Sequence, residues 1–393
     1  MSKKICVMLR DDGPTGYYRV TLPYSRLFQK SSYHIEQISS YDNPSLVAKK
    51  LDCDVFVIPR MHEPVWIETC KALRKANKTR IVIDHDDNMF SVSPLSNHYV
   101  DFGTSEVEIL SGKSRQWLWR DGENGFDVKA NVEKYNGFCE ALSVADMVTV
   151  TQPVLGDLYK EYNENIKVLP NCLDFSLWKK APMKPHDEVR LFWSGGSSHF
   201  EDWCLLEDVL PVVMSKYPDV HLYIQGTAFH GTLKNCPQER VHVNSWAPYQ
   251  ALPYICAIRD PDIAIIPLRE NEFNSCKSNI KWVEMSALGV PCVISNVDPY
   301  KVNYDGSNAV MIENNSSDGW IEGISTLVED KILRSRIAGE ALRYVKDNFD
   351  IDSKFKLWED SIEGLDSWRS PTPLTVPETR LSTKPSETSA YLH

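Results

Sequence analysis

The chain has 393 residues, of which 42% are hydrophobic and 25% are charged, and its formal net charge is −11. This length allows two domains with sizeable cores, and the composition is ordinary for a globular protein. The negative charge argues against a protein that coats nucleic acid by general electrostatic attraction, while leaving room for a local basic site.

The absence of targeting segments and the spacing of the cysteines also narrow the class of protein. No run of about 18 apolar residues occurs, and the start, MSKKICVMLRDDG, has too short an apolar segment for a signal peptide. We therefore expect a soluble, cytoplasmic protein. The ten cysteines include no C-x-x-C pair, and Cys6, Cys53 and Cys292 lie in predicted core strands. We expect neither disulfides nor a structural zinc site.

The first strand is expected at residues 4–9, KICVML, followed by a glycine-containing loop and a helix. The loop lacks the G-x-G-x-x-G spacing of dinucleotide sites, so Gly16 has two interpretations: a turn residue or part of a ligand site. Tyr17, Tyr18 and Arg19 at the end of the loop are polar candidates for such a site. A plain surface role for Arg19 is the alternative.

Apolar runs at residues 54–59 and 80–90 bracket a helical stretch at 63–77, which predicts a βαβ unit. Four titratable residues follow the second run, where parallel sheets place their sites: Asp84, His85, Asp86 and Asp87. The Asp-x-Asp spacing fits the binding of a divalent metal ion. The alternative is a structural role, in which these residues form a turn that caps the next element. We favour an acceptor site, in which His85 or Asp86 binds or deprotonates a hydroxyl.

Residues 91–131 are polar, aromatic and irregular. Trp117, Trp119 and Phe126 form either a local cluster or a stacking platform for a sugar or base. A helix at 131–144 and strands at 145–151 and 166–174 then complete a first domain.

The second half alternates short strands with helices, which predicts another parallel sheet with right-handed crossovers. Its first strand ends in Gly195 and Gly196, where the backbone can approach a ligand. Ser197 and Ser198 follow, and they can donate to phosphate oxygens or cap a helix.

The stretch from Phe273 to Asn296 combines a helix start near Ser278 with a buried strand after Pro291. Lys277, Lys281 and Glu284 are three and four positions apart and share one edge of that helix. Backbone N–H groups around Ser278 and Asn279, with Lys277 beside them, suit a diphosphate, and Glu284 could accept from a ribose hydroxyl. A solvated helical ion pair is the alternative.

The segment KSNIKWVEMSALGVPCVIS resembles the signature of glycosyltransferases with the GT-B fold, specifically the retaining E-x7-E, GT4-like family. In that family the second Glu holds the donor ribose, and a Lys or Arg near the first holds the diphosphate. Glu284 matches the second Glu. Cys276 stands eight positions earlier, where the first is expected, so the donor sugar and retention versus inversion stay open.

The N-terminal half resembles a bacterial and phage subgroup of these enzymes at DGPTGYYRVTLP, DHDDNMF and WRDGENGFD. By this resemblance the Gly16–Arg19 loop faces a cleft between domains, and Arg19 contacts acceptor or donor phosphate. VLPN resembles the end of an N-terminal domain, and KFKLWEDSIEGLDSW a closing helix that crosses back onto it.

The expected fold class is α/β, with two Rossmann-like domains of parallel sheets facing a cleft. The expected parts are an acceptor-side domain (1–175), a linker (176–188), a nucleotide-sugar domain (189–348), a closing helix (349–369) and a disordered tail (370–393). The expected reaction is transfer of a sugar from a nucleoside diphosphate donor, a UDP-sugar first, to an acceptor hydroxyl with retention.

Three groups of residues carry this hypothesis. The catalytic candidates are His85, Asp86, Asp84 and Arg19. The donor-binding candidates are Gly195, Gly196, Ser197, Ser198, Lys277, Ser278, Asn279, Lys281 and Glu284. The acceptor-binding candidates are Gly16, Tyr17, Asp87, Trp117 and Trp119.

No metal or cofactor is expected beyond the nucleotide sugar. The acceptor is left open among a glycan, a lipid-linked sugar, a metabolite and a hydroxymethylated DNA base, and the oligomeric state is also open. The alternatives are a nucleotide-sugar epimerase or phosphorylase of the same fold and a non-catalytic nucleotide-sugar-binding protein.

Overall fold

The computed structural model describes residues 3–111, 114–182, 185–245 and 247–368, and its chain divides into two compact units. The first unit contains Met1–Asp11, Leu27–Leu169 and Leu357–His393, and the second contains Asp12–Arg26 and Pro170–Lys356. The sequence analysis assigned residues 12–26 to the first domain, whereas their contacts place them in the second unit. The expected tail from Ser370 onward lies outside the described residues.

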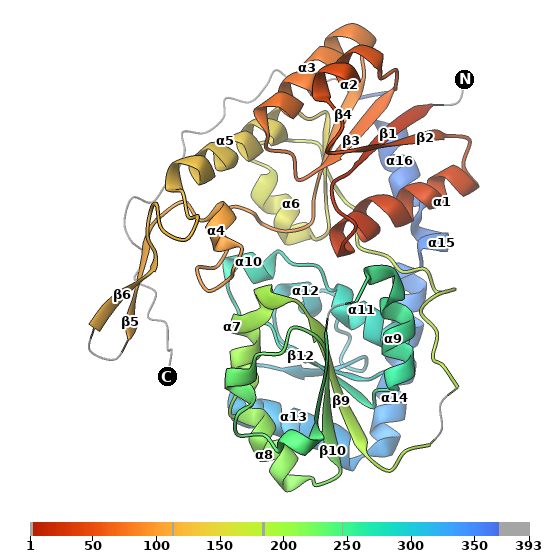
Figure 1. Ribbon diagram of the computed structural model, residues 1–393. Coiled ribbons are helices and arrows are strands. Elements are labelled where there is room, and N and C mark those ends of the chain that lie inside the picture. The colour runs from red at the N-terminus through yellow and green to blue at the C-terminus, as the bar shows by residue number, and fades with distance from the viewer. Residues whose placement is uncertain (1–2, 112–113, 183–184, 246, 369–393) are drawn as a thin grey trace. The chain divides into compact units, whose positions relative to one another are not determined.

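The first unit has a parallel six-stranded sheet in the order β2-β1-β3-β4-β7-β8 (Figure 1). Its strands are β1 (Lys4–Leu9), β2 (His34–Ser39), β3 (Val55–Pro59), β4 (Arg80–His85), β7 (Met147–Val150) and β8 (Ile166–Val168). Strand β2 is the one that the sequence analysis did not anticipate. It lies at the sheet edge with mostly accessible side chains, so it lacks the apolar run that marks a buried strand.

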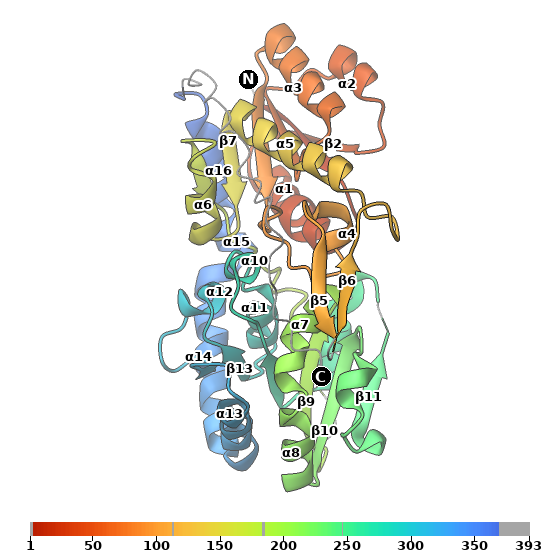
Figure 2. The same ribbon diagram turned by 90° about the vertical axis from the view of Figure 1, so that its left-hand side faces the viewer.

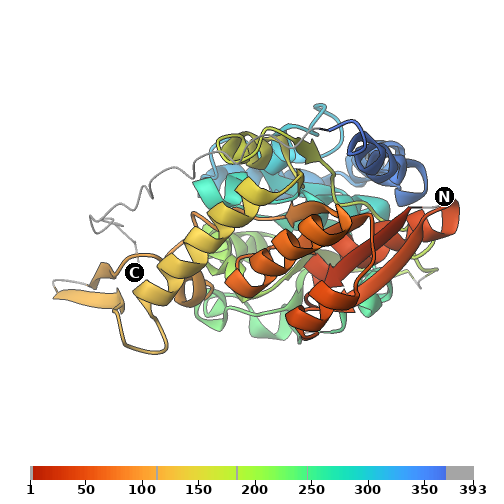
Figure 3. The same cartoon turned by 90° about the horizontal axis from the view of Figure 1, so that it is seen from above.

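The helices of this unit are α1 (Leu22–Lys30, which begins in the second unit), α2 (Pro44–Lys50), α3 (Pro64–Asn77), α4 (Tyr99–Phe102), α5 (Val128–Val144), α6 (Pro153–Tyr159) and α16 (Lys356–Gly364). Seen from above, α3 and α5 run side by side (Figure 3). Gly137 of α5 permits close packing, because a Cβ there would lie 2.0 Å from the carbonyl oxygen of His62.

Residues 107–111 and 114–119 form an antiparallel pair of strands, whereas the sequence analysis took this part of the chain for irregular. Strands β5 (Val107–Ser111) and β6 (Ser114–Trp119) pair with each other and make their own two-stranded sheet. Figure 2 shows this hairpin standing apart from the parallel sheet of the first unit. The hairpin was missed because its second strand is largely exposed and carries no apolar alternation.

The second unit has another parallel six-stranded sheet, in the order β11-β10-β9-β12-β13-β14. Its strands are β9 (Val189–Gly195), β10 (Val220–Gly226), β11 (Val241–Asn244), β12 (Ile263–Ile266), β13 (Cys292–Ser295) and β14 (Val310–Ile312). Each strand is followed along the chain by helical segments before the next, as the sequence predicted.

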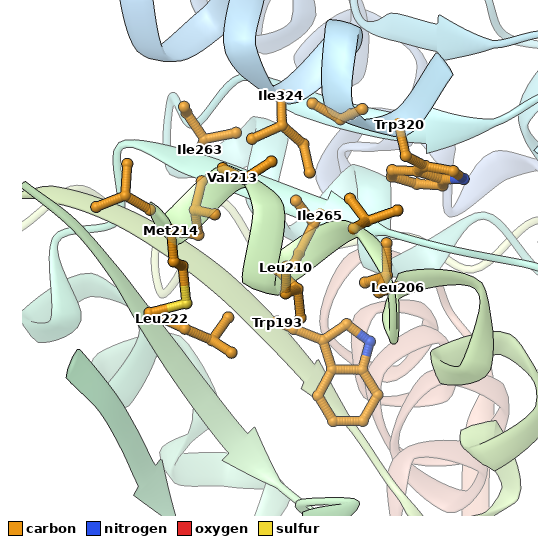
Figure 4. Packing of buried hydrophobic residues seen from close by; sticks show 14 of the residues in the cluster. Trp193, Leu206, Leu210, Val213, Met214, Leu222, Ile263, Ile265, Trp320 and Ile324 are labelled. Carbon is orange, nitrogen blue, oxygen red and sulfur yellow. The ribbon is translucent and has the colours of Figure 1, made fainter. Parts of the chain in front are cut away.

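One core cluster of this unit joins the sheet to two helices, α8 (Val209–Lys216) and α13 (Ser317–Glu329). Figure 4 shows Leu210 and Met214 of α8 packed near Trp193 and Leu222 of the sheet, with Ile324 of α13 close by. Burial of such side chains contributes about 1.5–3 kcal/mol each. This packing holds β9 and β12 in place through their buried side chains. The candidate site lies beyond the end of β9.

The remaining α-helices of the second unit are α7 (Phe200–Trp203), α9 (Leu252–Arg259), α10 (Glu272–Ser275), α11 (Ile280–Ala287), α12 (Asp298–Lys301), α14 (Lys331–Phe349) and α15 (Ile351–Lys354). The single closing helix expected at 349–369 is therefore the end of α14 followed by two separate helices. The short helices are a π-helix at Gly16–Thr21 and 3₁₀ turns at Ser197–His199, Cys204–Leu206, His230–Leu233, Gln238–Arg240 and Tyr249–Ala251. Across the described residues, no helix is both long and apolar enough to cross a membrane.

Candidate functional site

The glycine turn after β9 brings backbone close to backbone. Gly226 at the end of β10 has φ +117°, and a Cβ there would lie 2.2 Å from the carbonyl oxygen of Gly195. A Cβ on Gly195 would in turn lie 2.6 Å from the indole of Trp193. Both positions therefore require glycine, and their tight packing sets where the 3₁₀ turn Ser197–His199 begins.

Asn279 stands directly before α11 and is the clearest sign of a ligand site. Asn279 is 1% exposed, and among the described residues neither its Oδ1 nor its Nδ2 has a hydrogen-bond partner. It also makes no side-chain cap to the helix that it precedes. A buried amide without partners costs free energy, so native structures seldom keep one unless a ligand or water satisfies it.

Ser278, the next residue toward the N-terminus, is tied to a buried arginine. Asn171 Nδ2 donates to Ser278 Oγ over 3.1 Å, and Arg19 donates from its guanidinium to Asn171 Oδ1 over 3.0 Å. Arg19 is only 1% exposed, so the surface alternative is wrong. The structure brings Arg19 to the segment that precedes α11, within the second unit.

Glu284 lies one turn into α11 and is buried, which overturns the alternative of a solvated ion pair. Its Oε1 accepts hydrogen bonds from the hydroxyls of Tyr18, over 2.7 Å, and Tyr249. Burial raises the pKa of Glu284, while these hydrogen bonds and the charge of Lys281 oppose the rise. Its Oε2 makes no hydrogen bond within the described residues.

Sequence reasoning missed Tyr249 and named Tyr18 only as a polar residue of the glycine loop, although both donate hydrogen bonds to Glu284. Tyr17, an acceptor candidate, packs its ring 5.4 Å from that of Tyr249, and burial raises the pKa of Tyr17 to about 12. Gly16 is buried at the start of the π-helix that carries Tyr17 and Tyr18, whereas Tyr249 belongs to the 3₁₀ turn Tyr249–Ala251.

His199 closes the glycine turn, and sequence reasoning missed it as well. Its Nδ1 lies 2.7 Å from Oδ2 of Asp202, whose Oδ1 accepts from Asn274 Nδ2 over 2.8 Å. Burial, together with the charges of Lys281 and Lys277, lowers the pKa of His199 to about 4 against the opposing influence of Asp202.

Lys277 follows Cys276 and holds its ammonium group 4.5 Å from the centre of the Phe273 ring. Cys276 is 2% exposed, so the position of the first Glu in the resembling family is occupied by a buried thiol. The donor candidates Gly195 to Ser198 and Lys277 to Glu284 thus lie within one unit.

His85 of the first unit was expected to emerge from the sheet and act on a hydroxyl, but its side chain does not emerge. The imidazole is buried against the rings of Phe138 and Tyr159, with centroids 5.4 and 5.2 Å away. Neither ring nitrogen has a hydrogen-bond partner in the part of the chain that the structure describes, and burial lowers the pKa of His85 to about 3. As the last residue of β4, it points into the apolar layer between sheet and helices.

The three aspartates beside His85 are held by neighbouring side chains of the same unit. Asp84 accepts from Thr149 Oγ1 over 2.5 Å. Arg60 donates to Asp86 over 2.5 Å and to Asp87 over 3.1 Å. Arg60 itself has φ +46°, a strained backbone conformation that often accompanies a functional constraint.

The two tryptophans of the hairpin differ: one lies in a local aromatic cluster, and the other is accessible enough to serve as a stacking platform. Trp119 packs on Tyr99 and Phe126, and its Nε1 donates to the carbonyl oxygen of Pro94, so it belongs to a local cluster. Trp117 is 45% exposed, with the Arg120 guanidinium 5.9 Å from its ring. In the described part of the chain, no three His, Cys, Asp or Glu residues gather as a metal site.

Comparison with known proteins agrees with this geometry. Residues 190–330 match the family model "Glycosyl transferases group 1", which covers most of the second unit. This match over residues 190–330 confirms the enzyme class expected from the sequence, a glycosyltransferase. No curated protein sequence matches the chain.

Solved structures share the fold of the whole chain. Sucrose-phosphate synthase from Thermosynechococcus elongatus aligns with a TM-score of 0.63 and 10% identity, over 93% of this chain and 99% of that one. Anabaena HepE in complex with UDP-glucose aligns with a TM-score of 0.63 and 13% identity, over 93% and 100%. A glycosyltransferase from Rickettsia africae reaches 0.60 and 12%, over 93% and 98%. These likenesses confirm the GT-B fold.

Proposed function

We propose that the chain transfers a glycosyl group from a UDP-sugar to an acceptor hydroxyl, with the donor held by the second unit. The buried, unpartnered amide of Asn279 at the start of α11 carries this proposal. A helix N-terminus offers free backbone N–H groups, and the amide adds a donor and an acceptor that need a ligand. Anabaena HepE, which shares the fold, has been solved with UDP and with UDP-glucose.

The residues fit the parts of such a donor. Lys277 supplies positive charge for the diphosphate, and the tight turn at Gly195 lets backbone come close to it. Glu284 offers Oε2 to a ribose hydroxyl, because Tyr18 and Tyr249 engage only Oε1. No carboxylate stands at position 276, so contacts to the donor sugar have to come from other residues.

We further propose that the reaction retains the anomeric configuration, as in the resembling family. In that case the leaving phosphate takes the proton of the acceptor hydroxyl, and the chain needs no general base. This agrees with the burial of His85, the strongest base candidate of the first unit. Asp86 and Asp87 with Arg60 then orient an acceptor, whose identity stays open among a glycan, a lipid-linked sugar, a metabolite and a modified base.

The test is turnover with a panel of nucleotide sugars, following release of the nucleoside diphosphate by mass spectrometry, and nuclear magnetic resonance of the product anomer. UDP titrated calorimetrically into Lys277→Ala should bind about 2 kcal/mol more weakly than into the wild type. Lys234→Ala, which removes an exposed lysine of the same unit, is the matched control. Equal UDP affinity in all three proteins would contradict the assigned phosphate site.

A further inference from the structure

Asp202 is buried and His199 is partly buried, and the pair lies outside the segment that resembles the family signature. The imidazole is 12% exposed and the carboxylate 3%. Asp202 is fully engaged as an acceptor, since its Oδ1 takes hydrogen bonds from the backbone N–H of Arg269 and from Asn274 Nδ2, each over 2.8 Å. The proton shared with His199 therefore belongs to Nδ1 of the imidazole.

This assignment leaves Nε2 as the nitrogen that can meet a ligand. Nε2 makes no hydrogen bond within the described residues. The ring is fixed in orientation by Asp202 on one side and by an edge contact with Trp193, at 6.4 Å between centroids, on the other. A histidine oriented in this way resembles a ligand-binding imidazole held by a supporting carboxylate.

A continuous chain of hydrogen bonds connects His199 to the phosphate candidate Lys277. Asp202 links to Asn274 through its side chain, and the backbone N–H of Lys277 donates to the carbonyl oxygen of Asn274 over 3.1 Å. Asn271 caps this segment by accepting from the backbone N–H of Asn274. The glycine turn and the Lys277 segment are thereby held together by one buried network.

We propose that His199, positioned by Asp202, is a further ligand of the donor diphosphate and takes up a proton from solvent at Nε2 when the diphosphate binds. The inference rests on the proposed donor site and deepens it. The charged groups acting on His199 are Asp202 from its own turn and Lys277 and Lys281 from the segment leading into α11.

The physical reason lies in the balance of charge around the imidazole. Without ligand, burial and the two lysines keep the imidazole neutral at pH 7, because its pKa is about 4. A bound diphosphate offsets both lysine charges and adds negative charge of its own, which favours the imidazolium. Nδ1–H then stays with Asp202, and Nε2–H donates to a phosphate oxygen.

Calorimetric titration of UDP at pH 7, in two buffers of different ionisation enthalpy, measures the protons taken up on binding. His199→Gln should take up about half a proton fewer than the wild type and bind UDP about tenfold more weakly. Protonation of UDP itself cancels in this difference. His230→Gln, which changes an exposed histidine of the same unit, should match the wild type in both quantities.

The outcomes separate this inference from the proposed function. A wild type that does not bind UDP contradicts the donor site itself. Binding with equal proton uptake in wild type and His199→Gln overturns the role of His199 while leaving the donor site standing.

A second measurement covers the case in which His199→Gln folds poorly. The histidine ¹⁵N spectrum of the wild type, assigned with either His199→Gln or His199→Asn, should show the neutral Nδ1–H form becoming imidazolium on addition of UDP. A resonance that stays neutral at saturation would overturn the inference.

Discussion

Tyr18 donates a hydrogen bond to Glu284 over 2.7 Å, although 266 positions separate the two residues. Both residues belong to the second unit, because the segment Asp12–Arg26 packs with Pro170–Lys356 and not with the first unit. Tyr249 donates to the same oxygen, so Oε1 of Glu284 is fully engaged. The other oxygen is the one left for a ligand, and the first prediction tests it.

Glu284→Gln should weaken UDP binding about tenfold, because a hydrogen bond to a charged acceptor contributes about 1.5–3 kcal/mol. The matched ligand is 2′,3′-dideoxy-UDP, which lacks both ribose hydroxyls. Calorimetry of the two proteins with the two ligands completes a double cycle. If the effects of the substitution and of the missing hydroxyls simply add, Glu284 does not hold the ribose.

The same substitution should raise stability at neutral pH. The folded-state pKa of Glu284 lies above its ordinary value of 4.5, so the group favours folding below about pH 4.5. That contribution is lost as the pH rises through the folded pKa, and the ionised carboxylate is then buried at a cost. Thermal melting of Glu284→Gln at pH 7.5 should show a rise of about 1–3 °C, absent at pH 4. A lower melting temperature at pH 7.5 would contradict this sign.

Asn279→Ala should leave the unliganded protein as stable as before or slightly more stable, because it removes a buried amide without partners. UDP affinity should fall by about tenfold. Asn308→Ala is the matched control: Asn308 is equally buried, but its Nδ2 donates to the carbonyl oxygen of Asn303 over 2.8 Å. That variant should lose about 1–3 kcal/mol of stability. Equal destabilisation by both variants would mean that a water or the chain satisfies Asn279.

His85→Leu should flatten the dependence of stability on acid pH. The pKa of His85 falls from 6.5 to about 3 in the folded state, so only the unfolded chain takes up a proton between these values. The wild type therefore loses stability as the pH falls from about 6.5 toward 3, by a few kcal/mol in total. Urea unfolding at pH 4.5 and 7 measures the difference. If the variant keeps its fold at pH 7 but no longer transfers the sugar, His85 has a role in catalysis despite its burial.

Donor binding and turnover should both survive EDTA, because helix N–H groups and Lys277 can offset diphosphate charge without a divalent ion. Initial rates with and without EDTA, and with added manganese, provide the measurement. If EDTA abolishes the rate and manganese restores it, the prediction is wrong, and Asp84 and Asp86 become the candidate metal ligands. Arg60, which engages Asp86, would then have to release it.

The positions of the elements were largely predictable because the buried strands are continuous apolar runs. KICVML and VRLFW show this in the sequence, and both are central strands of their sheets. Strands β2 and β6 were not predictable in this way, since most of their side chains are accessible to solvent and leave no apolar period. Sequence patterns report burial, and exposed strands carry little of it.

For the candidate site, too, the sequence revealed some features and only the tertiary structure revealed others. The local spacing placed Lys281 and Glu284 on one helix, because helical geometry brings positions three apart together. The expectation that Lys277 shares this helix edge is wrong, because α11 begins at Ile280. Tertiary structure alone decided that Tyr18 and Tyr249 hold Glu284, that Asp202 orients His199, and that His85 turns into the core. These contacts join residues from different elements, and no local periodicity encodes which side chain of one element meets which side chain of another.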